Sequence, residues 1–450
     1  MMQRYEEYSD AQAAWLESLP SHWDCKKIGS LFTERKTKVS DKDYPPLSVA
    51  RIGVVPQLDT AVKTDAGDNR KLVCSGDFVI NSRSDRKGSC GVSELDGSVS
   101  LINIVLTPRQ QWNGRYVHYL MRSHPFSEEY YRNGRGIVAD LWTTRFSEMK
   151  SILLPIPPRE EQDQIVRFLD WKVSRVNQLI NTKRKEIKAI DAMQKSLISD
   201  AVIRGLNPDT EKKYSGCKFL GEIPAHWETI PLVSIAKEKS ISDCTELQLM
   251  SVYLDEGVIP FSQKEEKRTN ATSKDLSKYQ RVDPGDFVLN NQQAWRGSVG
   301  VAFDTGIVSP AYIVLSMDET LDREYANFLL RSRGMVDQYL IISRGVGSIQ
   351  RNIYWSSLKR VIVPIPPKDE QQQIVAYLKQ TVRIMRDTIS CLIEETEALE
   401  EYKKRLVADV VTGKIDVRDV EIPEYEFVDE DAGADSDSDD DSDDTEEQEE

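Results

Sequence analysis

The sequence is poor in the residues that bind metals or form disulfides. Its 450 residues include 6 cysteines and 4 histidines. The cysteines are scattered, with no Cys-x-x-Cys pair, and the histidines lack metal-ligand spacing. Unpaired thiols fit a reducing cytoplasm and argue against a zinc site, so we expect neither a metal nor a disulfide.

Long apolar runs are absent too. No stretch approaches the roughly 20 apolar residues that a membrane-spanning helix needs. Residues 1–10 are polar and acidic, which is not the pattern of a signal peptide. Together with the unpaired thiols, this predicts a cytoplasmic protein that does not enter a membrane.

Sequence motifs of catalysis are also missing. There is no GxxxxGK phosphate loop and no GxGxxG segment after a predicted strand. The tetrapeptides Asn-Pro-Pro-Phe and Asp-Pro-Pro-Tyr of adenine methyltransferases do not occur. We therefore expect that the chain is not an enzyme by itself, and that it has no catalytic residue and no bound cofactor.

The net charge of −15 comes from one end of the chain. Residues 421–450 hold 17 Asp and Glu and no Lys or Arg. We expect this tail to be disordered, because it has too little apolar surface to pack. The remainder carries 59 basic and 57 acidic residues, so nucleic-acid binding stays open if the basic side chains cluster.

What the sequence does contain is a long internal repeat. Pro-Ile-Pro-Pro occurs at 155–158 and again at 364–367, and the same offset of 209 residues relates the Glu-Gln and Ile-Val pairs that follow. The prolines favour extended backbone, and the acidic residues after them favour a helix N-terminus. We expect a long helix to begin after each proline motif.

Each predicted helix carries apolar residues at heptad spacing, with polar interruptions at 183, 194, 396 and 403 that would fix the register. At 1.5 Å per residue, each helix would be about 65 Å long and would need a partner for its apolar stripe. We predict one antiparallel coiled coil; two separate coiled coils, each serving another subunit, are the alternative. The seam positions are Leu169, Val173, Val176, Ile180, Ile187, Ile190, Leu197 and Ala201, and Leu378, Val382, Met385, Ile389, Leu392, Leu399, Leu406 and Val410.

A globular domain precedes each helix. Gly-Asp-Phe-Val at 76–79 corresponds to 285–288, and short β-branched runs punctuated by Gly and Asp indicate strands. With helical patterns at 116–124 and 325–333, the fold class is mixed α/β (α+β), a tandem duplication of domain and helix. The predicted boundaries are 1–18 for a short helix or loose lead-in, 19–154 for domain 1, 155–206 for the first proline motif and helix, 207–222 for a linker, 223–363 for domain 2, 364–420 for the second proline motif and helix, and 421–450 for the disordered tail.

Several repeated residues are predicted to be structural. His22 and His226 hold equivalent positions beside tryptophans, where strands begin. Gly91 and Gly300 are expected to permit turns or close strand approach. Trp142 is predicted to pack beneath a loop rather than to stack on a ligand.

These features together resemble the specificity subunits of type I restriction-modification enzymes. The resemblance rests on the Pro-x-His-Trp segments at 20–23 and 224–227, on the doubled proline motifs, and on Val-Thr-Gly-Lys-Ile-Asp-Val-Arg at 411–418. It implies two target recognition domains that read the halves of a bipartite site in double-stranded DNA, with the helices as a spacer. It also implies two methyltransferase subunits and restriction subunits as partners, which would bind S-adenosylmethionine, ATP and Mg²⁺ instead of this chain.

If one scaffold reads two DNA sequences, the reading residues should lie where the repeats differ. Two such loops occur: 82–87 corresponds to 291–296, and 135–145 to 344–354. Arg can bind guanine and Gln or Asn can bind adenine, while an arginine shared by both copies suits a phosphate. The candidate DNA-binding residues are Arg83, Arg86, Lys87, Arg135, Arg145, Gln292, Gln293, Trp295, Arg296, Arg344, Gln350, Arg351 and Asn352.

The alternative hypothesis is a duplicated coiled-coil scaffold that binds proteins and no nucleic acid. The near-neutral body and the acidic tail favour it. A DNA mobility shift with the chain alone, and with a methyltransferase partner, distinguishes the two hypotheses.

Overall fold

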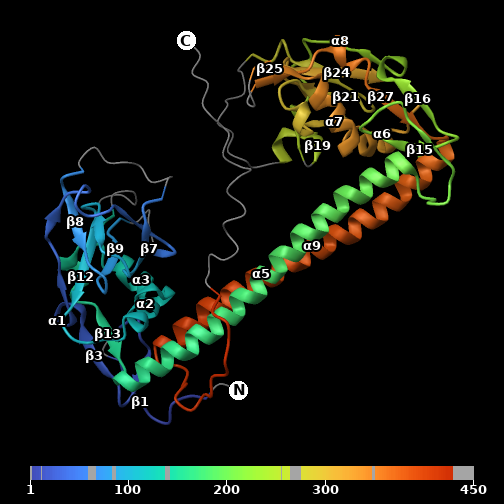
Figure 1. Cartoon of the computed structure of the whole chain (residues 1–450). Coiled ribbons are helices and arrows are strands. Elements are labelled where there is room, and N and C mark those ends of the chain that lie inside the picture. The colour runs from blue at the N-terminus through green and yellow to red at the C-terminus, as the bar shows by residue number, and fades with distance from the viewer. Residues whose placement is uncertain are drawn as a thin grey trace. The chain divides into compact units, whose positions relative to one another are not determined.

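A computed structural model describes residues 3–11, 13–58, 67–83, 88–136, 142–254, 256–263, 275–346 and 350–428, apart from the side chains at 346 and 350. Two compact units are present. Among the described residues, unit 1 comprises those up to Arg184 together with 393–428, and unit 2 comprises Lys185–Leu392. Each unit therefore contains one globular domain and parts of both long helices (Figure 1).

Unit 1 is built on an antiparallel four-stranded sheet. Its order is β10 (Cys90–Val92), β9 (Phe78–Asn81), β12 (Asn103–Pro108) and β4 (Phe32–Glu34). The same unit holds a sheet of β11 (Gly97–Val99), β8 (Arg70–Val73) and β5 (Lys38–Val39), and the hairpin of β6 (Leu47–Ala50) and β7 (Gly53–Pro56).

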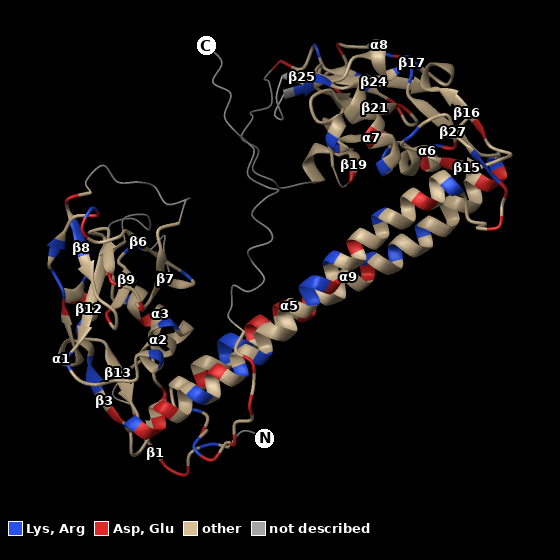
Figure 2. Cartoon of the chain, in the orientation of Figure 1, with Lys and Arg blue, Asp and Glu red and all other residues tan. Residues whose placement is uncertain are grey.

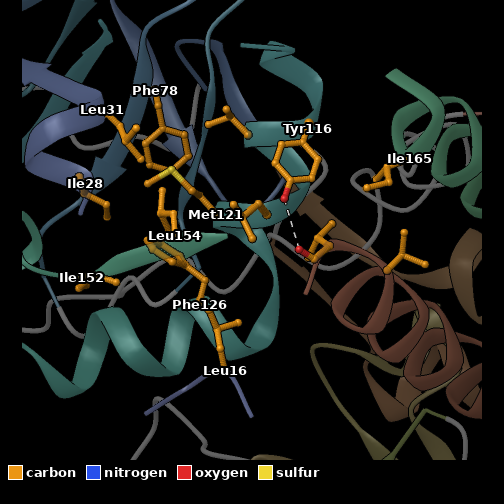
Figure 3. Packing of buried hydrophobic residues seen from close by; sticks show 14 of the residues in the cluster. Leu16, Ile28, Leu31, Phe78, Tyr116, Met121, Phe126, Ile152, Leu154 and Ile165 are labelled. Atoms are coloured by element: carbon orange, nitrogen blue, oxygen red, sulfur yellow. Dashed lines mark hydrogen bonds between the residues drawn. The ribbon is translucent and has the colours of Figure 1, made fainter. Parts of the chain in front are cut away.

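Strand β9 divides the core of unit 1 into two clusters. Phe78 and Ile80 belong to the larger cluster, together with side chains of α2 (Gly114–Arg122) and α3 (His124–Arg132) (Figure 3). Val79 belongs to a smaller cluster with valines of β8 and β11. Successive strand residues face opposite sides, so an unbroken Phe-Val-Ile run is what a strand buried on both faces requires.

Unit 2 repeats this plan. The corresponding elements are β17 (Ala236–Glu238), β18 (Met250–Tyr253), β19 (Gly257–Pro260), β20 (Gln280–Val282), β21 (Phe287–Asn290), β22 (Val299–Val301), β23 (Gly306–Val308), β24 (Tyr312–Met317), α6 (Arg323–Leu330) and α7 (Arg333–Ile342). The four-stranded sheet has the order β17-β24-β21-β22. Phe287 and Leu289 join the larger cluster, and Val288 joins the smaller one.

Two pairs of glycines bring a hairpin close to each sheet. A Cβ atom on Gly91 would lie 3.1 Å from Gly53 Cα, and one on Gly300 would lie 2.9 Å from Gly257 Cα. A side chain at either position would push β7 from β10, or β19 from β22. The prediction of close strand approach at these glycines is confirmed.

A strand pair and a short hairpin complete each unit. In unit 1 they are β3 (Asp24–Lys27) with β13 (Leu153–Ile156) and β1 (Tyr8–Asp10) with β2 (Ser18–Pro20). In unit 2 they are β16 (Glu228–Pro231) with β27 (Ile362–Ile365) and β14 (Lys212–Tyr214) with β15 (Glu222–Pro224). The remaining elements are α1 (Ile28–Leu31), α4 (Phe146–Met149), α8 (Trp355–Leu358), the 3-10 turns η3 (Leu232–Ser234), η4 (Phe261–Gln263) and η5 (Ala294–Arg296), and the hairpin of β25 (Arg344–Val346) and β26 (Gln350–Asn352).

The N-terminal segment differs from the expectation of a short helix or loose lead-in. Its described residues form the β1-β2 hairpin, and Tyr5, Ala13 and Leu16 are buried in the larger cluster of unit 1. The hairpin is therefore part of the domain that was predicted to begin at residue 19.

The long helices α5 (Arg159–Arg204) and α9 (Lys368–Val411) begin directly after the proline motifs, as predicted. The Gln of each Glu-Gln pair is buried and ties the helix start to the domain. Gln162 Oε1 accepts from Asn113 N–H at 3.0 Å, and Gln371 Oε1 accepts from Asp322 N–H at 2.6 Å. Asn113 and Asp322 cap α2 and α6, so the motif joins two helix starts.

Segments of α5 and α9 run antiparallel in each unit (Figure 1). In unit 1, Lys183 pairs with Glu395, and Lys403 Nζ donates to Asn177 Oδ1 at 3.1 Å, so rising numbers on α5 meet falling numbers on α9. No predicted seam side chain is exposed. The antiparallel coiled coil is confirmed, and it replaces the alternative of two separate ones. In the part of the chain that the structure describes, no helix is long and apolar enough to cross a bilayer.

Residues 417–428, the C-terminal strap, lie along α5 in unit 1. Gln164 Nε2 donates to the carbonyls of Val417 and Val420 at 3.0 and 2.9 Å. Ser174 Oγ donates to the Glu426 carbonyl at 2.9 Å. Disorder was expected from residue 421, but 421–428 are packed on the helix; 429–450 lie outside the described residues.

Candidate nucleic-acid interface

In unit 1 the two predicted loops lie against each other at the end of β9. Thr144 N–H donates to the Ser82 carbonyl at 3.0 Å, and Arg135 and Thr143 exchange backbone hydrogen bonds of 2.9 Å. Arg83 makes a further backbone bridge with Thr143. The fold thus joins segments far apart in sequence into one surface.

The candidates described in unit 1 are exposed arginines: Arg83, Arg135 and Arg145. Arg145 precedes α4, and its N–H donates to Glu148 Oε2 at 3.1 Å. Desolvation raises the pKa of Glu148, but hydrogen bonds from Ser147 and from the Arg145 N–H, with the charge of Arg135, lower this pKa below its ordinary value. Arg86 and Lys87 lie outside the described residues.

Trp142 packs beneath the second loop of unit 1. Its Nε1 donates to the Tyr131 carbonyl at 2.9 Å, and the two rings stack with centroids 6.0 Å apart. The hydrogen bond and the ring contact hold the indole against the rest of the domain, which confirms the prediction that Trp142 packs beneath the loop.

In unit 2 the corresponding loops also meet, at the end of β21. Ile353 N–H donates to Asn291 Oδ1 at 2.8 Å. Turn η5 follows in the first loop and closes at Gly297, whose φ of 109° favours glycine. The Gln292 side chain is exposed and that of Gln293 is half-buried.

Trp295 brings two arginines together. Its Nε1 donates to the Gln292 carbonyl at 2.8 Å, which fixes the ring. The guanidinium carbons of Arg296 and Arg351 lie 4.8 and 5.5 Å from the ring centroid, within cation–π range. Trp295 of the first loop therefore contacts Arg351 of the second loop.

The hairpin β25-β26 places the remaining candidates on two opposite faces. Arg344 is paired with Asn352, and Gly345 with Arg351. Since strand residues alternate in direction, Arg344 and Asn352 share one face and Arg351 lies on the other. Arg344 is exposed and Asn352 half-buried, while the side chain of Gln350 is not among those described.

Basic residues lie on the β25-β26 hairpin of unit 2, beside the β25 label in Figure 2. Within the described ranges, Arg296, Arg344 and Arg351 form no ion pair with an acidic residue. Clustered arginines without carboxylate partners repel each other and suit a polyanionic ligand.

A cleft beside the loops of unit 2 was missed by the sequence analysis. Asn291, Lys278, Tyr312 and Tyr354 are among its lining residues, and Tyr354 is 51% exposed. These residues come from separate segments that no motif connects. Only the divergence of the repeats around residue 354 pointed to this place.

The repeated histidines are structural, as predicted. His22 Nε2 lies 2.8 Å from Glu161 Oε2, and His226 Nε2 lies 2.5 Å from Glu370 Oε1. Each pair joins the start of a domain to the first turn of a long helix. Across the ranges that the structure covers, no group of three or more His, Cys, Asp and Glu side chains could hold a metal ion.

Comparison with known proteins agrees with this architecture. The type I restriction-modification specificity subunit MjaVIII of Methanocaldococcus jannaschii is 25% identical over 443 residues, which is 93% of this chain and 99% of that protein. The predicted MjaX specificity subunit of the same organism is 27% identical over 277 residues, which is 60% of this chain and 61% of that protein.

A solved structure described as the basis of "complex assembly and conformational transition of the type I R-M system" shares the fold. Its chain superposes with a TM-score of 0.62 at 16% identity, covering 88% of this chain and 99% of that one. The profile of the type I restriction modification DNA specificity domain matches twice, at residues 20–189 and 224–395. These two matches span well over half of the sequence, so the chain belongs to the family of type I restriction-modification DNA specificity domains and carries two copies of the domain.

Proposed function

We propose that this chain reads a bipartite DNA site for a type I restriction-modification complex, one half-site with each unit. The proposal rests on the contrast between the buried residues that the two units share and the loop residues in which they differ. The buried glycines and glutamines recur at equivalent positions of the two units. The loops at the ends of β9 and β21 carry different side chains on this shared frame.

Within the loops, we assign two kinds of contact. Gln292 and Gln293 suit adenine, whereas arginines suit guanine or phosphate. Arg135 and Arg344 occupy equivalent positions in both units, which suits a phosphate contact that positions the DNA without specifying bases.

The chemistry would then belong to partner subunits. We propose that two methyltransferase subunits and restriction subunits join this chain in the cytoplasm, and that S-adenosylmethionine, ATP and Mg²⁺ bind to them. The chain itself would be non-catalytic. The absence of phosphate-loop and methyltransferase motifs from its sequence supports this division, as do the names of its relatives.

Exchange of one domain tests the proposal. Replacing residues 28–152 by the matching segment of a relative leaves the β3-β13 pair and both long helices intact. Methylation mapping of DNA treated with the assembled complex should show one changed half-site and one unchanged half-site.

The matched control replaces residues 232–361, between β16 and β27, and should change the other half-site. Alteration of both half-sites by either exchange would contradict independent reading. A wild-type complex that binds all DNA sequences equally, or none, would favour a protein-binding scaffold instead.

A further inference from the structure

We infer that Arg351 reads a guanine in the half-site of unit 2, and that Trp295 is the positioning residue that presents it; this rests on the proposed function. Both residues are candidates for DNA contact from the sequence, which does not rank them or separate their roles. The ranking comes from four features of the structure.

The first feature is the cation–π contact between Arg351 and Trp295. Its guanidinium lies 5.5 Å from the centroid of Trp295, and the indole is itself fixed by its bond to the Gln292 carbonyl. A cation–π contact with a fixed ring restricts the rotamers of the guanidinium, which leaves less rotamer freedom to lose when a ligand binds. A fixed fork suits the O6 and N7 acceptors of guanine better than it suits a phosphate, which can be met from many directions.

The second feature is an unsatisfied donor. Among the described residues, Arg351 Nε is buried without a hydrogen-bond partner, and Nη1 makes a 3.5 Å contact with Ser343 Oγ. A guanidinium has five N–H donors. With Nε enclosed, the donors left for a ligand are those on Nη1 and Nη2, which form the end of the fork.

The third feature is the sorting of side chains by the β25-β26 hairpin. Arg351 is paired with Gly345, which has no side chain to compete for the same space. Arg344 is paired with Asn352 on the opposite face. The two arginines of one hairpin therefore face different directions, and Arg344 provides a matched control for Arg351.

The fourth feature is local charge. Arg296 contacts the same indole as Arg351, with its guanidinium carbon 4.8 Å from the ring centroid. Two cations beside one ring, without an acidic partner among the described residues, are poorly compensated until an anion approaches. The phosphates of DNA supply that negative charge, and the edge of a guanine supplies the acceptors O6 and N7.

The test uses the full chain in complex with its methyltransferase partner. Binding is measured to the recognised site and to variants in which each guanine of the unit 2 half-site is replaced by 7-deazaguanine, which lacks the N7 acceptor. For the wild type, we expect one position where this replacement weakens binding about tenfold, within the range of a lost bidentate contact.

Arg351→Lys retains the charge and loses the planar fork. We expect this variant to bind the normal site about tenfold more weakly and to show no further loss with 7-deazaguanine at that position. Trp295→Ala should reduce the same discrimination, because the fork is no longer held. Arg344→Lys should keep the full discrimination.

Three results would overturn the inference. The first is an Arg351→Lys variant that loses affinity equally for all DNA sequences, which marks a phosphate contact. The second is an Arg351→Lys variant that still responds to 7-deazaguanine as the wild type does. The third is a loss of discrimination in Arg344→Lys alone. Thermal melting of each variant identifies a folding defect, and Arg351→Gln then provides a second substitution. Failure of the wild type to prefer any DNA sequence would refute the proposed function itself, and so is distinct from these results.

Discussion

The N-terminal parts of α5 and α9 are equivalent in the repeat, yet side chains at equivalent positions differ in their burial. Phe168 of α5 is 2% exposed, whereas Tyr377 at the equivalent position of α9 is 41% exposed. Phe168 lies one turn beyond Gln164, which binds the C-terminal strap, and it packs in the core of unit 1. One aromatic position is therefore a core residue in one unit and a surface residue in the other.

Further along the helices, the side chains match these roles. Ser174 and Asn177 are buried and bind the strap backbone at Glu426 and Val428. Their counterparts in α9 are Arg383 and Arg386, which are exposed. Short polar side chains can satisfy a backbone that lies against the helix, while two arginines favour contact with water.

The cause lies in what the chain does after each helix. In unit 2 the chain leaves α5 and continues into the β14-β15 hairpin. In unit 1 a separate N-terminal segment supplies the equivalent hairpin, β1-β2, so the residues that follow α9 are available to form the strap. The repeat gives both helices the same start, but the segment that follows each helix decides which helix face is covered.

The largest expected effect of a single substitution is at the paired aromatic positions. Phe168→Ala should lower the free energy of unfolding of unit 1 by about 3–5 kcal/mol, because a buried ring is replaced by a cavity. Tyr377→Ala should change the stability of unit 2 by about 0.5 kcal/mol or less, since its side chain is largely in water. Calorimetry of the full chain, with amide exchange to assign each transition, measures both. Equal losses at the two positions would show that the helix faces are equivalent.

An intermediate effect is expected where the strap is bound. Ser174→Ala removes a hydroxyl that donates to the Glu426 carbonyl and accepts from the Val428 N–H at 2.7 Å. The loss should be about 1–3 kcal/mol of local stability, because two backbone groups lose a buried partner. Faster amide exchange at Val428 reports it directly, and Arg383→Ala is the matched control. Unchanged exchange would mean that the strap is held by other contacts.

The smallest effect is expected at two equivalent tyrosines. Tyr325 Oη donates to the Val202 carbonyl at 2.8 Å. Tyr116 Oη shares its proton between two more distant acceptors, the Pro155 carbonyl at 3.3 Å and the Val411 carbonyl at 3.4 Å (Figure 3). Burial raises the pKa of both hydroxyls well above the ordinary value, so both stay neutral donors. Tyr325→Phe should cost about 1 kcal/mol and Tyr116→Phe somewhat less. Thermal melting of the two variants decides the order, and a reversed order would place the stronger bond in unit 1.

The sequence by itself determined the frame of this protein. The offset of 209 residues, the helix starts after the proline motifs and the seam positions such as Leu169 and Leu378 all correspond to elements of the structure. These features depend on local chemistry and on a period that is visible along the chain. Gly91 and Gly300 belong to the same class, since a glycine that recurs at an equivalent position indicates a close backbone approach.

Only the tertiary structure decided what the chain ends do and how the loop residues divide their roles. The N-terminal hairpin and the strap mix apolar with acidic residues, and no local pattern indicated where their apolar side chains would pack, so we expected a loose lead-in and disorder there. They pack because Leu16 and the backbone of residues 417–428 find partners far away in sequence, on the core and on α5. Likewise, Trp295 and Arg351 are 56 positions apart, and their contact arises from the meeting of two loops. Such contacts depend on long-range pairing of strands and helices, which a local pattern of residues does not encode.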